Sequence, residues 1–539
     1  MPNQNKKTSK EPIILKAIIN FVGNAQKLLC FEHKQLTRTT IPHNMDIRIK
    51  NLFTTERLRE SAVTSSKRSE TCDARNDFES DLSRALFSSA ARRLHDKTQV
   101  FPLTSDDNIH SRLTHSMEVM NVGASLAKDI CFNKAFCERY GIENIYELYD
   151  PMRAILQTVG LVHDIGNPPF GHFGEQTIRE FFKKYFAQNP DILGEYHPWM
   201  SDFTAFDGNA QGFRVITKLQ FIDDLYGLNL TRSSLASYLK YPNCGNGNGS
   251  TDLIELHKQG VFNADQEYLH RVMGETRRNS ATSYKRHPFA YLVEAADSIC
   301  YLSMDLEDAY NKGWFTLLKL YNEWKGFTGN CDKKAAELFE SLRKASCESG
   351  SLERKGFINF RIGIIRYLVE KAVERYIDSF EEILAGDYNN ELILDDGNNV
   401  AKFLKKFCIR HIYSRKEIQS IELTGWSVIN GLLEIYTKLL LGDKVYMRHG
   451  EAMISLSVLR ANKMDYMVHN GIIEWNPTSK LYTDKRDGTA IYDIDALCDS
   501  FPIEQLPNYY RLRIIVDFIS SMTDKFAVKH YQKLSGQRI

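Results

Sequence analysis

Helical spacing of apolar residues dominates this chain from about residue 75 onward, and no other feature limits the available folds as much. In the segment 113–130, Val119, Val122 and Leu126 recur three to four residues apart, which places them on one face of a helix. Pro288 suits the first turn of a helix that continues without Gly or Pro to residue 310. Further long helical stretches are predicted at 357–384, 423–441 and 509–534.

Alternation of apolar and polar residues, the pattern of a half-buried strand, is nearly absent. One short hairpin is predicted within 472–492, where Asp487 and Gly488 supply a turn between Tyr482 and Ile491. We find no internal repeat and no linker long enough to separate independent domains. The sequence therefore predicts an all-α fold with at most a short β-hairpin.

The size and charge of the chain exclude several classes of protein. Its 539 residues can bury a large core, and 43% apolar with 25% charged residues is an ordinary globular mix. With 69 basic and 68 acidic residues the formal net charge is +1, which excludes a uniformly basic nucleic-acid wrapper. No uncharged apolar run reaches the roughly 18 residues of a membrane span. Ten scattered cysteines without a C-x-x-C pair favour a reducing compartment, so we expect a cytoplasmic protein without membrane association.

The first 44 residues differ in pattern from the rest. They combine several lysines with short apolar stretches, and Lys16 interrupts the apolar run. A secretory signal needs an unbroken apolar run and a small-residue cleavage site, so a signal peptide is disfavoured. Two interpretations stay open: an atypical, disordered N-terminal extension over 1–44, or translation that begins at Met45.

Four side chains of metal-binding type lie in helical, largely apolar segments. His163 and Asp164 are adjacent at the end of an apolar run, His115 lies on an earlier helix, and Asp297 on a later one. Two imidazoles and two carboxylates suit Mn²⁺, Fe, Co²⁺ or Mg²⁺ better than a structural zinc site, which usually contains thiolates. Burying an unpaired aspartate costs several kcal/mol, and a shared cation would compensate both carboxylates.

Longer motifs around these residues resemble those of one known family. In chain order they read KTQVFPL (97–103), RLTHSMEV (112–119), HDIGNPPFGHFGE (163–175), GNAQG (208–212), EAAD (294–297), DLEDA (305–309) and ISSMTD (519–524). Over roughly residues 75–535 the chain resembles the bacterial deoxyguanosinetriphosphate triphosphohydrolases, or dGTPases, of the HD-domain phosphohydrolase superfamily. The resemblance implies a single unit over 45–539, with a helical HD core at about 75–310 and a C-terminal helical part at about 311–539.

The resemblance also implies a reaction and the residues that perform it. Family members hydrolyse dGTP to deoxyguanosine and tripolyphosphate by attack of water on the α-phosphorus, with a divalent metal ion. The ion is Mn²⁺ or Mg²⁺, with Co²⁺ and Fe as alternatives. Carried over, the family's metal ligands are His115, His163, Asp164 and Asp297, and its catalytic pair is His172 and Glu175. Its substrate contacts are Asn209, Lys240 and Tyr241 around the phosphates, and Gln99, Tyr301 and Asp305 around the sugar.

Simpler interpretations of these residues stay open. A helix start accounts for GHFGE without any catalytic role, and Asp297 could be an ion-pair partner of Arg286 or Lys285. Lys240 could be a solvated surface lysine, and Tyr301 an ordinary core residue. The Gly/Asn loop over 242–250 is predicted to face solvent directly after the phosphate-contact segment, which puts the local substrate contacts in question.

The leading prediction is a metal-dependent dGTP triphosphohydrolase. No short motif indicates the hydrogen-bond donors and acceptors that would recognise guanine. A broad-range dNTP triphosphohydrolase is therefore an alternative, as are other HD-type phosphohydrolases. A nucleotide- or single-stranded-DNA-binding regulator is the alternative from a different class. The partners implied by the resemblance are dGTP or another dNTP, further copies of the chain in a homo-oligomer such as a hexamer, and single-stranded DNA.

Overall fold

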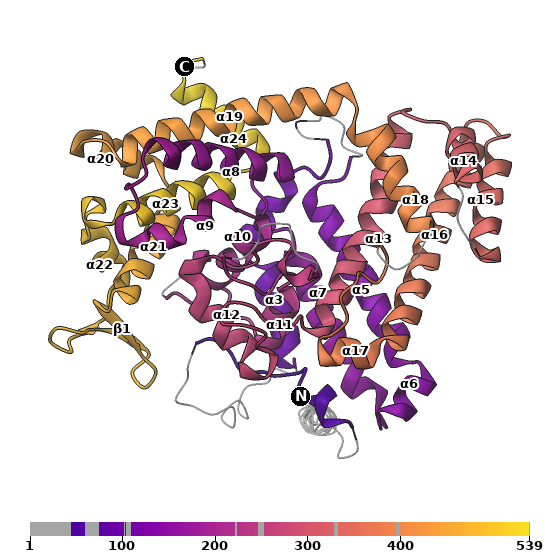
Figure 1. The fold of residues 1–539 in the computed structure, drawn as a ribbon, viewed down its shortest axis with the longest axis horizontal. Helices are drawn as coiled ribbons and strands as arrows, with labels where there is room; N and C mark the ends of the chain where they lie inside the picture. The colour runs from indigo at the N-terminus through magenta and orange to yellow at the C-terminus, as the bar shows by residue number, and fades with distance from the viewer. Residues whose placement is uncertain are drawn as a thin grey trace, which may run out of the picture.

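The computed structural model describes residues 45–59, 75–101, 103, 109–220, 224–245, 253–327, 332–394 and 399–537, so the predicted extension over 1–44 lies outside the described residues. Helices account for most of these residues, and one small sheet accompanies them (Figure 1). The predicted all-α class is confirmed. Among the described helices, none has the length and apolar character that a membrane crossing requires.

The first half of the chain forms α2 (Ile47–Lys50), α3 (Asp77–Leu86), α4 (Ser89–Arg93), α5 (Arg112–Cys131), α6 (Lys134–Arg139), α7 (Ile145–Val162), α8 (Gly171–Gln188), α9 (Ser201–Thr204), α10 (Gly208–Arg214), α11 (Arg232–Tyr238) and α12 (Gln266–Met273). The second half forms α13 (Pro288–Asn311), α14 (Leu317–Gly326), α15 (Lys333–Ala345), α16 (Ser351–Asp378), α17 (Phe380–Ala385), α18 (Asn399–Cys408), α19 (Lys416–Leu440), α20 (Lys444–Met453), α21 (Leu456–His469), α22 (Ile494–Ser500), α23 (Asn508–Ser521) and α24 (Asp524–Leu534). Single turns of π-helix extend α10 as η4 (Val215–Leu219) and α18 as η8 (Ile409–Tyr413).

Three helices, α5, α7 and α13, pack against one another at the centre of the molecule (Figure 1). A capping box starts α5: the Ser111 hydroxyl accepts from the Thr114 amide, and the Thr114 hydroxyl accepts from the Ser111 amide. The His287 side chain caps α13, and Pro288 occupies its first position, as predicted. This packing brings His115 on α5 close to the end of α7 and to the middle of α13.

A second apolar core joins the C-terminal helices to α8 and α9. Helix α19 runs along one side of the molecule and contacts α8, α23 and α24 (Figure 1). The Gly425 backbone lies so close to the Phe170 ring that a Cβ there would approach the ring carbons to 2.6 Å. A larger residue at 425 would therefore displace the start of α8.

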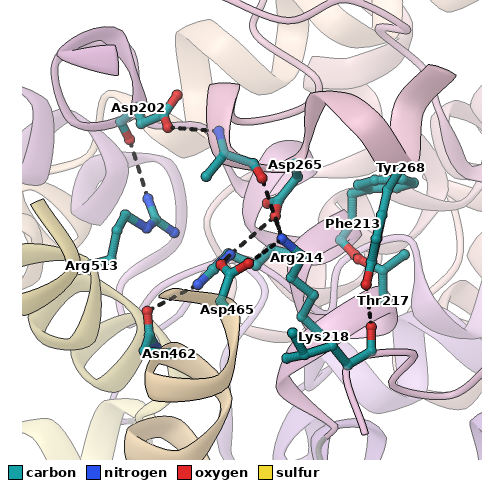
Figure 2. Close-up of polar contacts among 12 residues, drawn as sticks. Asp202, Phe213, Arg214, Thr217, Lys218, Asp265, Tyr268, Asn462, Asp465 and Arg513 are labelled. Carbon is teal, nitrogen blue, oxygen red and sulfur yellow. Dashed lines mark hydrogen bonds and ion pairs between the residues drawn. The ribbon is translucent and has the colours of Figure 1, made fainter. Parts of the chain in front are cut away.

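A buried network of charges ties the predicted HD core to the C-terminal part (Figure 2). The Arg214 guanidinium, on α10, contacts the carboxylates of Asp465 at 3.0 Å, Asp517 at 3.0 Å and Asp265 at 3.1 Å. Lys218 adds contacts of 2.6 Å to Asp265 and 2.8 Å to Asp465. Because α10 lies on one side of the predicted boundary and α21 and α23 on the other, the two parts share one interior. The boundary at about 310 stays a prediction.

The sheet contains one strand more than the predicted hairpin. Strands β1 (Ile473–Asn476), β2 (Leu481–Asp484) and β3 (Ala490–Ile491) pair antiparallel in that order. Tyr482 pairs with Ile491 across the predicted turn, in which Gly488 has a φ of 73°.

Three other predictions need correction. The predicted helix over 509–534 is two helices, because the Thr523 hydroxyl accepts from the Phe526 amide and starts a new helix after an extended Met522. The predicted helix over 357–384 likewise divides at Ser379 into α16 and α17. The loop over 242–250 was predicted to face solvent, which is wrong at its start: Asn243 is fully buried, and its side-chain amide donates to the carbonyls of Glu255 and Lys258.

Candidate active site

Three of the four predicted metal ligands lie together where α5, α7 and α13 meet. Nε2 of His115 is 3.0 Å from Oδ1 of Asp297, and Nε2 of His163 is 3.6 Å from the same oxygen. One ligand atom from each of the three residues lies within 4.8 Å of the others. His115 is fully buried, and the side chains of His163 and Asp297 are 12% and 29% exposed. This is a compact His–His–Asp cluster at the wall of a cavity.

Asp164 borders this cluster but is held by neighbours. Its Oδ1 is 3.7 Å from Nε2 of His163 and accepts a hydrogen bond of 2.7 Å from the Asn167 side chain. Its Oδ2 forms an ion pair with Arg112. The charge of Arg112 and those of His163 and His115 lower the pKa of Asp164 to about 2, although burial alone would raise it. Asp164 is therefore ionised, and one of its oxygens faces the histidines.

The side chains present fit a divalent cation. Nδ1 of His163 lies 2.8 Å from the carbonyl of Gly160, a contact that orients the ring so that Nε2 faces the carboxylates of Asp164 and Asp297. That Nε2 is buried and has no hydrogen-bond partner among the described residues. Two imidazoles with two ionised carboxylates are a donor set suited to Mn²⁺, Mg²⁺, Co²⁺ or Fe. Nε2 of His163 is thus a nitrogen ligand atom without a hydrogen-bond partner among the described residues, at the place where a cation would lie.

His172 and Glu175 form a second pair, at the start of α8. Nδ1 of His172 is 3.1 Å from Oε2 of Glu175, and the other Glu175 oxygen accepts from the Gly208 amide at 2.9 Å. The Glu175 side chain is 2% exposed, whereas that of His172 is 78% exposed. The charge of Glu175, and next its hydrogen bond, raise the pKa of His172. Burial would raise the pKa of Glu175, but the charge of His172 and its hydrogen bond lower it to about 2.

The backbone before this pair is in an uncommon conformation. Phe170 precedes α8 with φ 62° and ψ 18°, the left-handed region that non-glycine residues rarely adopt. Gly174 follows, where a Cβ would lie 2.1 Å from the carbonyl oxygen of Pro169. The GHFGE segment therefore makes a tight entry into α8 that turns the His172 ring toward the cavity. The simpler interpretation, a helix start without a catalytic role, does not require this backbone geometry.

A cavity of about 480 Å³ gathers nearly all of the predicted site residues. Its lining includes His163, Asp164, Asp297, His172, Gln99, Asn209, Lys240, Tyr241, Tyr301 and Asp305. The two remaining predicted residues, His115 and Glu175, lie behind this wall and contact members of it. Residues from six of the seven sequence motifs thus line or support one cavity.

One part of the cavity is rich in positive charge. Lys240 lies 2.9 Å from the Glu294 carboxylate, and Lys258 lies 3.3 Å from that of Asp207. Arg112, which forms an ion pair with Asp164, also lines the cavity. The Lys240 side chain is 28% exposed and lines the cavity, so the interpretation of a solvated surface lysine is wrong. Three cations beside the metal cluster favour an anionic ligand with several charges.

The cavity lining also contains two buried acceptors without hydrogen-bond partners among the described residues. Oε1 of Gln99 and Oδ1 of Asp305 have no hydrogen bond among the described residues, while the Tyr413 hydroxyl donates to the other Asp305 oxygen. Burial is the main cause that raises the pKa of Asp305 to about 7. Tyr301 lies one helical turn before Asp305 on α13. Unpaired buried acceptors cost about 1–3 kcal/mol each, so a ligand that donates hydrogen bonds here would gain affinity.

The lining residues that sequence reasoning did not assign include Arg112, Lys258, Tyr413 and Glu422. Arg112 begins the RLTHSMEV motif, so that motif carried a signal for it. Tyr413 and Glu422 come from η8 and α19, more than 100 residues beyond α13, and no motif marks them. Only tertiary packing places them in the cavity.

Comparison with known proteins agrees with this arrangement. Residues 112–193 match the HD domain model, and residues 502–533 match the model of the phosphohydrolase-associated domain. The chain is 32% identical over 499 residues to the deoxyguanosinetriphosphate triphosphohydrolase-like proteins of Listeria innocua and Listeria monocytogenes, covering 90% of this chain and 98% of each relative. It is also 32% identical to the deoxyguanosinetriphosphate triphosphohydrolase of Enterobacter sp., covering 85% of this chain and 93% of that protein.

The chain belongs to the dGTPase family of HD-domain phosphohydrolases. The HD match begins at Arg112 and spans α5, α7 and α8, so it contains His115, His163, Asp164, His172 and Glu175. The associated-domain match covers α23 and α24, which lie beside the start of α8. The resemblance seen in the sequence motifs is thereby confirmed at the level of the family.

Proposed function

We propose that this protein is a metal-dependent dNTP triphosphohydrolase that prefers dGTP and releases deoxyguanosine and tripolyphosphate. The observation that carries the proposal is the placement of a His–His–Asp cluster, the His172–Glu175 pair and three cations around one cavity of about 480 Å³. A cavity of this size fits a single nucleotide. Family membership supports the reaction class.

The metal ligands in this proposal are His115, His163, Asp164 and Asp297. When bound there, a divalent ion supplies Lewis-acid chemistry and neutralises charge on the phosphoryl oxygens. The protein's part is to keep both aspartates ionised, as their lowered pKa values indicate, and to present Nε2 of His163 as a free donor. Arg112 keeps one Asp164 oxygen in place.

His172 acts as the general base. Its Nδ1–H donates to Glu175, which leaves Nε2 to take a proton from the attacking water. The water oxygen bonds to the α-phosphorus, the bond from the α-phosphorus to O5′ breaks, and O5′ leaves with a proton as the nucleoside hydroxyl. Because Glu175 also accepts from the Gly208 amide, the imidazole is held in one orientation.

The remaining contacts divide between phosphate and sugar. Lys240, Lys258 and Arg112 supply charge for the triphosphate, with Asn209 and Tyr241 as hydrogen-bond donors. At the sugar, the unpaired oxygens of Asp305 and Gln99 can accept from hydroxyl groups, and Tyr301 supplies a ring face. A ring beside C2′ leaves little room for a ribose hydroxyl, which disfavours GTP.

Preference for guanine is assigned to Glu422 on α19. Of the carboxylates that line the cavity, Glu422 alone has no hydrogen bond or ion pair among the described residues. Guanine presents two donors, N1–H and the 2-amino group, on one edge, and an ionised carboxylate accepts from both. Adenine offers an acceptor at N1 and would be repelled there.

The test is a product analysis with dGTP, dATP, dCTP, dTTP and GTP, in Mn²⁺ or Mg²⁺ and then with a chelator. We expect deoxyguanosine and tripolyphosphate in equal amounts, fastest from dGTP, and no turnover after chelation. The Glu422→Gln variant should lose most of the preference for dGTP over dATP and still hydrolyse both. Equal rates on all dNTPs by the wild type would show a general dNTP triphosphohydrolase, and orthophosphate or pyrophosphate as first product would refute the reaction.

A further inference from the structure

The junction between α23 and α24 contacts two loops of the candidate active site. Asp524, the first residue of α24, is 2% exposed. Its Oδ1 accepts from the Phe170 amide at 3.0 Å. Its Oδ2 accepts from the Thr98 amide at 3.0 Å and from the Thr98 hydroxyl at 2.7 Å. One carboxylate therefore joins two segments that are 72 residues apart in the chain.

Lys97 forms further hydrogen bonds at the same junction. Its side chain is buried, and Nζ donates to the carbonyl of Asn167 at 2.5 Å and to that of Ser520 at 2.8 Å. Lys97 directly precedes Thr98, and its two partners are backbone groups of the loop before α8 and of the end of α23. The buried Lys97 amine and the buried Asp524 carboxylate thus attach the same two loops to one helix junction.

Each loop carries a different part of the site. Thr98 directly precedes Gln99, one of the unpaired acceptors at the sugar end. Phe170 precedes His172 by two residues and holds the uncommon left-handed conformation at the start of α8. Such a conformation persists only where its surroundings enforce it, and the bond from the Phe170 amide to Asp524 is one such constraint.

Local helix stability does not account for this geometry. The cap of α24 is Thr523, whose hydroxyl accepts from the Phe526 amide. Asp524 favours the helix as an acidic residue in the first turn, but any exposed orientation of its side chain would serve that purpose. Both of its oxygens instead contact segments outside α24.

We propose that Asp524, supported by Lys97, is a positioning residue that sets the catalytic pair and the sugar contacts relative to each other. The phosphohydrolase-associated segment would then complete the active site without contacting substrate. This inference rests on the proposed function for its kinetic part only, since the attachment of the two loops can be measured without turnover.

The test compares Asp524→Asn with a matched control, Asp443→Asn, in the full chain. The asparagine at 524 keeps one acceptor oxygen but presents an N–H₂ group to the other backbone donor, so one loop is released. Asp443 also accepts from two backbone amides at a helix start, those of Val445 and Tyr446, on exposed α20. Both variants make the same chemical change, and only the first touches the active-site loops.

For Asp524→Asn we expect kcat for dGTP to fall 10- to 100-fold, the loss typical of displaced catalytic groups. The acid limb of the kcat–pH profile should move to lower pH, because His172 placed farther from Glu175 loses the interaction that raises its pKa. Hydrogen exchange should quicken over 95–101 and 165–175 only. The Mn²⁺ affinity of Asp524→Asn should equal that of the wild type. The control, Asp443→Asn, should equal the wild type in kcat, pH profile, hydrogen exchange and Mn²⁺ affinity.

A wild-type kcat and pH profile in Asp524→Asn would overturn the proposal. So would a uniform rise in hydrogen exchange with an unmoved pH profile, because that pattern marks a general loss of stability. If Asp524→Asn does not fold, Thr98→Val removes one of the three bonds and should lower kcat about 3-fold with the same local exchange pattern, and an unchanged enzyme would again overturn it. If the wild type turns over no dNTP, the proposed function fails, and local exchange in Asp524→Asn alone decides this inference.

Discussion

The Glu175 carboxylate bridges the Nδ1 atom of His172, at 3.1 Å, and the Gly208 amide, at 2.9 Å. Its burial at 2% exposure contrasts with the 78% exposure of the His172 side chain. A buried carboxylate that orients an accessible imidazole is the arrangement expected of a general base and the group that orients it. His172 therefore has both the access and the fixed orientation that proton transfer requires.

Replacement of either member of this pair should lower the rate of hydrolysis. We expect His172→Gln to reduce kcat by about 10²- to 10⁴-fold, the usual worth of a general base. Glu175→Gln should reduce kcat less and move the acid limb of the pH profile to lower pH, since Glu175 raises the pKa of His172. Glu180→Gln makes the same change at a half-buried residue of α8 whose carboxylate accepts from the Gln176 side chain. It should leave kcat and KM unchanged.

Loss of one proposed metal ligand should weaken metal binding without unfolding the chain. We expect Asp297→Asn to bind Mn²⁺ at least about 100-fold more weakly in calorimetry, because loss of even an outer partner of a metal ligand costs 10- to 100-fold. Asp129→Asn, an exposed change on α5, is the control and should bind as the wild type does. Unaltered Mn²⁺ binding by Asp297→Asn would remove this residue from the metal site.

Buried Asp305 should make stability depend on pH. Its folded pKa of about 7 lies above the ordinary value of 3.8, mainly because of burial. The favourable contribution of the neutral carboxyl is therefore complete below about pH 4 and is lost as the pH rises through about 7. The loss approaches about 4 kcal/mol, at about 1.4 kcal/mol per pKa unit. In urea unfolding of metal-free protein, Asp305→Asn should remove most of the decline that the wild type shows between pH 5 and pH 8. An equal decline in both proteins would contradict this assignment.

Removal of the central cation of the buried network should destabilise the whole chain. Arg214→Met leaves Asp265, Asp465 and Asp517 without their shared guanidinium, and breaking a buried pair costs about 3–5 kcal/mol. Arg486→Met, whose side chain is 81% exposed, should change the unfolding free energy by no more than about 0.5 kcal/mol. Equal unfolding midpoints for the two variants would show that the network does not hold the C-terminal helices to the core.

Much of this arrangement could be predicted from the sequence. The features that could not be predicted depend on a single capping residue or on contacts between distant segments. Apolar spacing predicted α5 and α13, because three-to-four-residue recurrence is a local signal. It did not predict the break at Met522, since a single capping residue, Thr523, divides an otherwise continuous apolar pattern. Short-range motifs likewise pointed to the residues that the structure gathers in one cavity.

Contacts between distant segments were beyond sequence reasoning. The Tyr413 hydroxyl donates to Asp305 across 108 residues of chain, and Glu422 enters the cavity from α19. Neither residue lies in a motif, and no periodicity signals a contact between a π-helical turn and the middle of α13. Arg112 begins the RLTHSMEV motif, but nothing in the sequence indicated that it forms an ion pair with Asp164.

Hydrolysis of dGTP in H₂¹⁸O tests the central claim most directly. Attack of water on the α-phosphorus with loss of O5′ places one ¹⁸O atom in tripolyphosphate and none in deoxyguanosine. Mass spectrometry of both products should therefore show a 2 Da increase in tripolyphosphate alone. An ¹⁸O label in deoxyguanosine, or labelled orthophosphate or pyrophosphate as the first product, would contradict the account.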